Sequence, residues 1–134
     1  MILGVGVDLI EVVRVKDALE DPRIGRRVRQ RVFTPQEIEY CEARKRKFES
    51  YAGRFAAKEA VMKALGRGWG RRLGWSEIEV VLALTGEPGI SLHNKAADFA
   101  RELGVDRFSL SITHSESYAI AYLIAEGKTA PPPS

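Results

Sequence analysis

The stretch Arg54-Phe-Ala-Ala-Lys58-Glu59-Ala-Val-Met-Lys63-Ala-Leu-Gly66 decides the fold, because it predicts the long helix on which a sheet can pack. Along this stretch and the residues just before it, Phe48, Ala52, Phe55, Met62 and Gly66 recur at spacings of three and four, with Glu59 at the position between Phe55 and Met62. We expect this helix over residues 49 to 65, with Gly66 ending it, since glycine readily takes the left-handed conformation that closes helices. Glu59 lies inside the apolar stripe, and a carboxylate that faces a core needs a partner.

Asp8 is the best candidate for that partner, because it closes an apolar run near the N-terminus, Ile2 to Val7. Apart from its glycines this run is apolar at both odd and even positions, which face opposite sides of a sheet. The pattern therefore predicts a strand buried on both faces. Two carboxylates, waters and substrate phosphates make the oxygen-rich site that Mg2+ prefers. We therefore expect Asp8 and Glu59 to bind Mg2+ together with a phosphate ester.

Both residues also have simpler explanations. Asp8 could cap the helix expected over residues 10 to 20, and this role does not exclude metal binding. Glu59 and Lys63 are four residues apart, and such a pair on an exposed helix contributes only about 0.2–0.5 kcal/mol. The position of Glu59 on the apolar stripe favours the functional interpretation, because an exposed structural pair has no reason to lie there.

The remaining helices are predicted from local signals. Thr34-Pro35-Gln36-Glu37 is a capping box with proline at the first helical position, so a helix should begin there and carry Ile38, Cys41 and Phe48. Residues 23 to 31 before it are expected to be an arginine-rich connection. A further short helix is expected over residues 95 to 103, where Gly104 should end it.

Alternation of apolar and polar residues predicts the strands. Residues 78 to 84 alternate in this way, and the turn 85–89 leads into residues 90–92, which together indicate a hairpin. Two more strands are expected at 108–112 and 118–124. The fold class is therefore α+β: a single compact domain over residues 1–126, with a mainly antiparallel sheet packed with the long helix. The Pro-rich tail 127–134 is expected to be disordered.

The charge pattern predicts an anionic partner. The net charge is only +3, yet 14 of the 21 basic residues are arginine, which favours bidentate contacts to phosphate or carboxylate. Arg14 and the clusters at 23–31 and 44–47, which include Arg44 and Arg46, suggest an acidic macromolecular partner, although such clusters are often only solvated faces. With one cysteine, Cys41, and no signal peptide or apolar run of membrane-spanning length, we expect a cytoplasmic protein that binds no membrane.

Two further features suit a phosphate ligand. His114 has the same parity in its strand as Phe108, Leu110 and Ile112. Its side chain should therefore lie on the buried face, at the end of the strand and among neighbouring hydroxyl side chains. A histidine at a strand end is more often a structural hydrogen-bonding residue, and no second histidine nearby suggests zinc. Glycines 66, 68, 70 and 74 form a loop that could approach a ligand closely.

Two other classes of protein fit less well. A metal-dependent nuclease or phosphohydrolase would usually show more acidic ligands or a second histidine. A nucleic-acid-binding module would place aromatic residues between its basic clusters, and the 44–47 run has only Phe48 within reach. We therefore expect no nucleic-acid partner.

The chain resembles the holo-[acyl-carrier-protein] synthases, the small bacterial 4'-phosphopantetheinyl transferases, over nearly all of residues 1 to 126. The stretches that carry the resemblance are Gly6-Val7-Asp8-Leu9-Ile10 with Arg14, Phe33-Thr34-Pro35-Gln36-Glu37 with Tyr40-Cys41, Arg54 to Gly66, Ile78-Glu79-Val80, Gly86-Glu87-Pro88, and Ser111 to Ala121. Two departures limit the resemblance: the segment 67–72 is unusually rich in Trp and Arg for this region, and the Pro-rich tail has no counterpart, so their roles stay open.

The resemblance implies a reaction, in which phosphopantetheine passes from coenzyme A to a serine of apo acyl carrier protein in fatty acid biosynthesis, releasing adenosine 3',5'-bisphosphate. It implies that Asp8 and Glu59 bind Mg2+, that Lys63 lies by the pyrophosphate, and that Arg54 and His114 hold the 3'-phosphate. Lys58, Gly66, Gly86 and Pro88 are the other residues expected to bind coenzyme A. The carrier protein supplies the serine, and either Asp8 or Glu59 could accept its proton.

The resemblance also implies partners. Arg14 matches a position that contacts the acidic carrier protein, and we expect Arg44 and Arg46 to assist it. These synthases are typically homotrimers whose nucleotide lies between neighbouring chains, with the turn Gly86-Glu87-Pro88 presented by the adjacent chain. Shared active sites also agree with size, because one small domain has little room for a cleft that would bury coenzyme A. The same turn could instead be simply a good tight turn.

Overall fold

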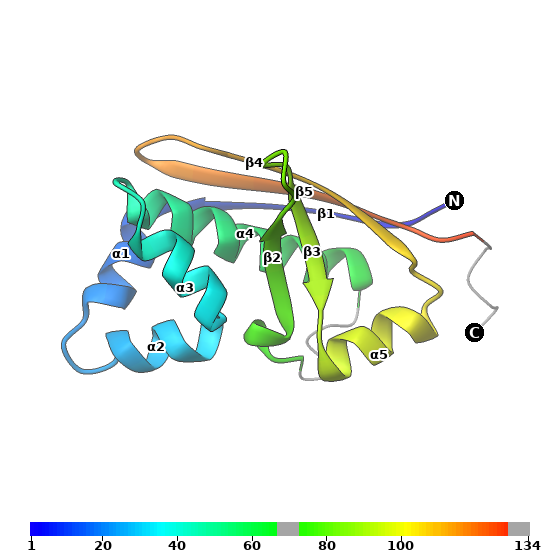
Figure 1. Cartoon of the computed structure of the whole chain (residues 1–134), viewed down its shortest axis with the longest axis horizontal. Helices are drawn as coiled ribbons and strands as arrows, with labels where there is room; N and C mark the ends of the chain where they lie inside the picture. Colours follow the sequence, from blue (N-terminus) through cyan, green and yellow to red (C-terminus); the bar gives the residue numbers. More distant parts are fainter. Residues whose placement is uncertain (67–72, 129–134) are drawn as a thin grey trace.

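A computed structural model describes residues 1–66 and 73–128 of the chain (Figure 1). Its central element is the 19-residue helix α4 (Lys47–Leu65), which packs against a three-stranded antiparallel sheet. The strands of this sheet are, in spatial order, β1 (Ile2–Glu11), β5 (Tyr118–Glu126) and β4 (Arg107–His114). A second sheet is the hairpin of β2 (Ile78–Leu82) and β3 (Pro88–Leu92).

Shorter helices complete the fold. They are α1 (Val12–Glu20), α2 (Gly25–Val32), α3 (Pro35–Glu42) and α5 (Asn94–Glu102), with the 3-10 helix η1 (Trp75–Glu77) before β2. Figure 1 shows α1, α2 and α3 gathered at one end of α4 and α5 toward the other, with the hairpin between them. None of the helices in the described ranges is both long and apolar enough to span a bilayer. The predicted α+β class is confirmed, although the strands form two sheets and not one.

Two glycines set how closely β1 approaches α4. A Cβ atom added to Gly4 would lie 2.0 Å from the carbonyl oxygen of Ala64, and one added to Gly6 would lie 1.9 Å from that of Ala60. Neither position therefore accepts a side chain. Because side chains alternate along a strand, Asp8 lies on the same face as these glycines and is directed toward α4.

The prediction that the first strand is buried on both faces was wrong. Val5, Val7 and Leu9 on its other face are 48%, 49% and 58% exposed, because α4 covers only one side of the sheet. The pairing of Val7 with Tyr122 and Leu9 with Ile120 extends this surface onto β5. We call it the outer apolar face, and its residues are Val5, Val7, Leu9, Tyr118, Ile120 and Tyr122.

The helix predictions were partly right. The capping box is confirmed: the Thr34 hydroxyl accepts from the Glu37 amide at 3.2 Å, and the Glu37 carboxylate accepts from the Thr34 amide at 2.9 Å. That helix ends at Glu42, so Phe48 belongs to α4, which ends at a left-handed Gly66 as predicted. The first helix begins at Val12 and not at residue 10, since β1 continues to Glu11.

The arginine-rich connection predicted over residues 23–31 was wrong, because most of it forms α2. This helix buries Gly25 and Val32 and half-buries Val28, which lie at spacings of three and four, and it leaves most of its arginines exposed. Of these three inward positions only Val28 and Val32 carry an apolar side chain, so the helical pattern in the sequence was weak.

In the second half of the chain the predicted hairpin, short helix and two strands are confirmed. The predicted disordered tail lies outside the described residues except for Gly127 and Lys128. Gly127, one residue past the predicted boundary, is buried and exchanges two hydrogen bonds with Met1. The segment 67–72, whose role was left open, also lies outside the described residues.

Candidate active site

A cluster of three charged residues lies where β1 meets α4. The Lys63 ammonium group donates to the Asp8 carboxylate and to the Val7 carbonyl oxygen, at 3.0 Å each. Glu59 lies one turn earlier on α4 and is half-buried. Burial raises the pKa of Glu59, the negative charge of nearby Asp8 raises it further, and Lys63 acts in the opposite direction. We call Asp8, Glu59 and Lys63 the carboxylate cluster.

This arrangement fits a divalent cation whose other ligands are waters and substrate phosphates. Two carboxylates that raise each other's energy by repulsion are stabilised when a cation binds between them. Within residues 1–66 and 73–128 no group of three or more His, Cys, Asp and Glu side chains could hold a metal alone. Mg2+ does not need such a group, because it is commonly held by one or two carboxylates, waters and substrate phosphates.

The two simpler explanations, that Asp8 caps a helix and that Glu59 only pairs with Lys63, do not account for this geometry. The residue at the N-cap of α1 is Glu11, three positions after Asp8, and no side chain caps that helix. The two hydrogen bonds of Lys63 cross to β1, so Lys63 does more than pair with Glu59 along the helix surface.

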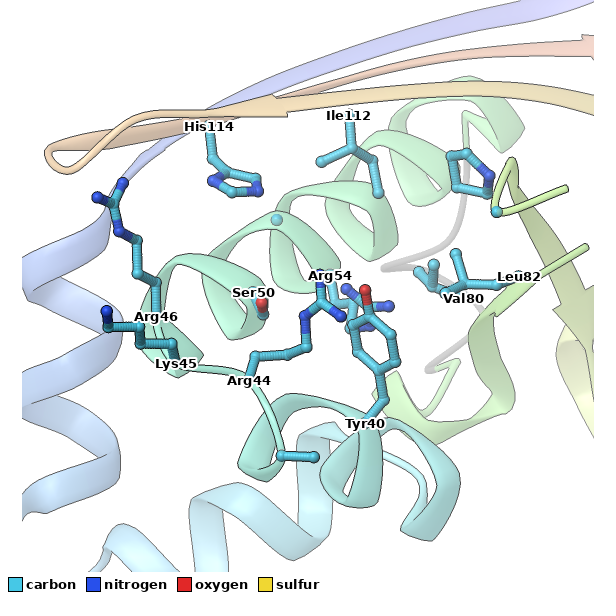
Figure 2. Close-up of a pocket in the computed structure, with 14 residues that line it drawn as sticks. Tyr40, Arg44, Lys45, Arg46, Ser50, Arg54, Val80, Leu82, Ile112 and His114 are labelled. Atoms are coloured by element: carbon cyan, nitrogen blue, oxygen red, sulfur yellow. The ribbon is translucent and has the colours of Figure 1, made fainter.

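A pocket of about 530 Å3 opens on another side of α4 (Figure 2). Its walls come from α3 and the connection after it, the first half of α4, the end of β4, strand β2 and the hairpin turn. Five of its side chains are basic: Arg44, Lys45, Arg46, Arg54 and His114. We call it the cationic pocket, and its composition suits a ligand with at least one phosphate group.

Arg54 is the most buried of these basic groups, at 7% exposed. Its guanidinium group lies over the ring of Tyr40, 4.0 Å from the ring centre, and Figure 2 shows the two side chains facing one another. Its Nε atom is buried and has no hydrogen-bond acceptor among the described residues. Because buried donors normally find an acceptor, this atom indicates that a ligand oxygen belongs nearby.

His114 projects from the end of β4 into the same pocket (Figure 2). Its Nδ1 atom lies 2.8 Å from a carboxylate oxygen of Glu49, which is nearly buried in the first turn of α4. The prediction had assigned His114 to the phosphate but had not found Glu49. No local signal could have done so, because the two residues are 65 positions apart.

The carboxylate cluster and the cationic pocket lie on opposite sides of α4. At about 100° per residue, Ser50 of the pocket and Glu59 are about 180° apart around the helix, as are Arg54 and Lys63. None of the cluster residues lines the pocket. In the sheet order β1-β5-β4, Asp8 lies on one edge strand and His114 on the other. One chain therefore does not bring both groups to one ligand.

The hairpin turn belongs to the cationic pocket of its own chain, since Gly86 and Pro88 line it beside Arg54 and His114. Gly86 has a φ of 88°, a conformation that glycine takes readily. Gly66 lies instead at the exposed end of α4, one turn after Lys63. The residues expected to bind coenzyme A thus fall into two separate groups.

Lys58 does not fit the expected role in binding coenzyme A. Its ammonium group is completely buried, lies 2.7 Å from the Glu37 carboxylate and donates to the carbonyl oxygens of Trp75 and Ile78. Burial lowers the pKa of Lys58, and Glu37 opposes that effect. Since this ammonium group has all its partners within the chain, Lys58 holds α3, α4 and the start of β2 together.

The residues expected to bind a partner protein lie in two different places on the chain. Arg14 is exposed on α1, which packs against α2, and it borders an apolar cleft of about 190 Å3 lined by Phe33 and Phe55. Arg44 and Arg46 are exposed and line the cationic pocket, whereas Arg14 borders a different cleft.

Comparison with known proteins identifies the class. The profile of the 4'-phosphopantetheinyl transferase superfamily matches residues 4–123. The chain therefore belongs to that superfamily and is a transferase.

Its relatives define the group more narrowly. It is 48% identical to the holo-[acyl-carrier-protein] synthase of Solibacter usitatus, over 94% of this chain and 99% of that one. It also resembles the solved structure of the Helicobacter pylori synthase in complex with coenzyme A, with 30% identity, a TM-score of 0.78 and coverage of 91% and 99%. The Bacillus anthracis synthase, solved in complex with "CoA (3',5'-ADP)", gives 32% identity, a TM-score of 0.76 and coverage of 96% and 99%. The resemblance to the holo-[acyl-carrier-protein] synthases is confirmed.

Proposed function

We propose that this enzyme transfers the 4'-phosphopantetheine group of coenzyme A to a serine of apo acyl carrier protein and releases adenosine 3',5'-bisphosphate. In this proposal Mg2+ binds at Asp8 and Glu59, and the product serves fatty acid biosynthesis. The observation that supports it best is the presence, on one small chain, of both a carboxylate cluster and a pocket with five basic side chains. A ligand with both a pyrophosphate and a separate phosphate group matches that pair of sites.

The chain's own residues would act mainly by positioning and by charge. Mg2+, when bound, would neutralise charge on the pyrophosphate oxygens. Lys63 adds a second positive charge beside that group, while Arg54 and His114 hold the 3'-phosphate. The serine oxygen forms a bond to the β-phosphorus, the bond from that phosphorus to the bridging oxygen breaks, and adenosine 3',5'-bisphosphate leaves. The serine proton passes to a carboxylate of the cluster.

We further propose that each active site is shared between two chains of a homotrimer. Because the two groups lie on opposite sides of α4 and on opposite edges of the sheet, one ligand can contact both only if a second chain supplies the pocket. A head-to-tail contact of this kind gives a ring when the rotation between neighbouring chains closes. The outer apolar face supports association, since contiguous exposed apolar surface often marks a protein interface. Three chains per ring is the number that the family resemblance implies.

Transfer itself is tested with apo acyl carrier protein, coenzyme A and MgCl2. Intact-mass measurement should show that the carrier protein gains one phosphopantetheine group, and a serine-to-alanine carrier should gain none. Coenzyme A with Mg2+ at 100 times its Kd should also stabilise the enzyme by about 2.7 kcal/mol, which raises the Tm. RNA, DNA and simple phosphate esters at equal phosphate concentration should not. A Tm raised by RNA or DNA but not by coenzyme A would contradict the proposal.

The carrier protein should dock by electrostatic attraction, because Arg14 is exposed on α1 and Arg26, Arg27 and Arg31 are exposed on α2, the helix that packs against α1. The KM for carrier protein should therefore rise with ionic strength much more than the KM for coenzyme A. Arg14→Ala should raise the KM for carrier protein in low salt and leave the KM for coenzyme A unchanged. Lys128→Ala is the control, as it removes one exposed positive charge elsewhere. A KM for carrier protein that does not change with salt would exclude this docking surface.

A further inference from the structure

Glu49 is an unexpected residue in the wall of a pocket for anions. Its side chain is only 10% exposed, and a carboxylate oxygen lies 2.8 Å from Nδ1 of the pocket residue His114. A carboxylate beside a bound phosphate repels it, so on charge alone Glu49 lowers the affinity of this pocket for its ligand. A favourable effect through His114 would offset that repulsion.

The contact determines how His114 can act. A carboxylate only accepts hydrogen bonds, so the proton on this bond belongs to Nδ1 of the imidazole. This leaves Nε2, on the far side of the ring, as the nitrogen that can meet a ligand. For Nε2 to donate to a phosphate, the ring must carry a second proton. Glu49 stabilises the resulting positive charge, as carboxylates do for other histidines that they orient.

We propose that Glu49 is a positioning residue for coenzyme A binding: it holds His114 so that Nε2 donates a hydrogen bond to the 3'-phosphate in the cationic pocket. The inference rests on the proposed function, which places that phosphate there. The other charged groups of the pocket are Arg44, Lys45, Arg46 and Arg54, all positive. Arg46 is also 3.9 Å from Glu49, so its contribution has to be separated by experiment.

Glu49 also has a purely structural explanation that the experiment must exclude. It lies in the first turn of α4, where a negative charge stabilises the helix dipole. Loss of that role lowers the Tm and affects every substrate alike. Loss of the positioning role affects only ligands that carry the 3'-phosphate, and only while His114 is present.

The experiment compares coenzyme A with 3'-dephospho-coenzyme A. Glu49→Ala should raise the KM for coenzyme A about tenfold, the expected loss for one hydrogen bond to a charged group, with kcat nearly unchanged. The KM for 3'-dephospho-coenzyme A should stay the same. Glu49→Gln should lie between wild type and alanine, because the amide oxygen can still accept from Nδ1 but carries no charge. Glu39→Ala, which removes an exposed carboxylate on α3, should change neither KM.

Two double variants complete the design. In a His114→Ala background, Glu49→Ala should have no further effect on the KM for coenzyme A, because the two residues act as one unit. In an Arg46→Ala background the full effect should persist. The proposal is overturned if Glu49→Ala and Glu49→Gln change both KM values equally, leave both unchanged, or add to His114→Ala. A wild-type enzyme that does not use coenzyme A would instead refute the proposed function, so the two failures are distinguishable.

Discussion

Glu59→Gln is expected to lower kcat about a thousandfold, near the upper end of what removing one preorganised electrostatic group costs an enzyme. Asp8→Asn should have a similar effect. Both substitutions keep the shape of the side chain and remove a negative charge that a divalent cation requires. Transfer at saturating coenzyme A and carrier protein, measured over a range of Mg2+ concentrations, provides the test.

The same substitution should not destabilise the protein. The pKa of Glu59 lies above its ordinary value of 4.5, chiefly because the side chain is partly buried and also because Asp8 is close. Because this carboxyl group binds its proton more tightly in the folded state, the folded protein loses stability as the pH rises from 4.5 through the raised pKa. At neutral pH the ionised Glu59 therefore lowers the free energy of unfolding. Glu59→Gln removes this cost, and the Tm without metal should be equal to or above that of wild type.

The control for both measurements is Glu39→Gln, an exposed carboxylate on α3 that should leave kcat and Tm unchanged. Near wild-type turnover of Glu59→Gln at ordinary Mg2+ concentrations would show that Glu59 does not hold the metal. An inactive variant with a markedly lower Tm would assign Glu59 a role in folding.

Local signals in the sequence predicted most of the fold. The capping box at Thr34 and Glu37, the left-handed Gly66 and the hairpin turn each depend on residues only a few positions apart, and each is confirmed. Helix α2 was missed because its buried side includes Gly25, which carries no apolar signal. The burial of β1 was overestimated because a pattern of apolar residues does not reveal whether a second layer is present in the same chain.

The candidate site was predictable only in part, for a different reason. The sequence and its resemblance selected Asp8, Glu59 and Arg54, but only the structure shows that α4 separates the carboxylate cluster from the cationic pocket. The surroundings of Lys58 were not predicted, because the sequence does not distinguish a lysine whose ammonium group binds a ligand from one whose ammonium group binds a buried carboxylate. Its burial against Glu37 depends on a contact between two helices, which periodicity alone does not show.

Two inactive variants are expected to restore activity when they form mixed trimers. The first is Glu59→Gln, which lacks the carboxylate cluster, and the second carries Arg44→Glu with Arg46→Glu, which reverses two charges of the cationic pocket. Both arginines are exposed, so their replacement should not disturb the fold. If each site takes its cluster from one chain and its pocket from the next, random mixing in equal amounts leaves about a quarter of the sites with two intact halves. Activity should recover to about that fraction of wild type after dissociation and reassembly.

A matched control uses the same mixture with the second chain replaced by one that carries all three substitutions. No site in that mixture has an intact carboxylate cluster, so activity should stay at the level of the separate variants. Native mass measurement of differently tagged chains establishes that mixed trimers have formed. Recovery in the first mixture and not in the control requires a site built from two chains, because within one chain neither variant holds both halves. Mixed trimers without recovery would place the complete site within one chain, and the separation of the two groups across α4 would then need a conformational change to bring them together.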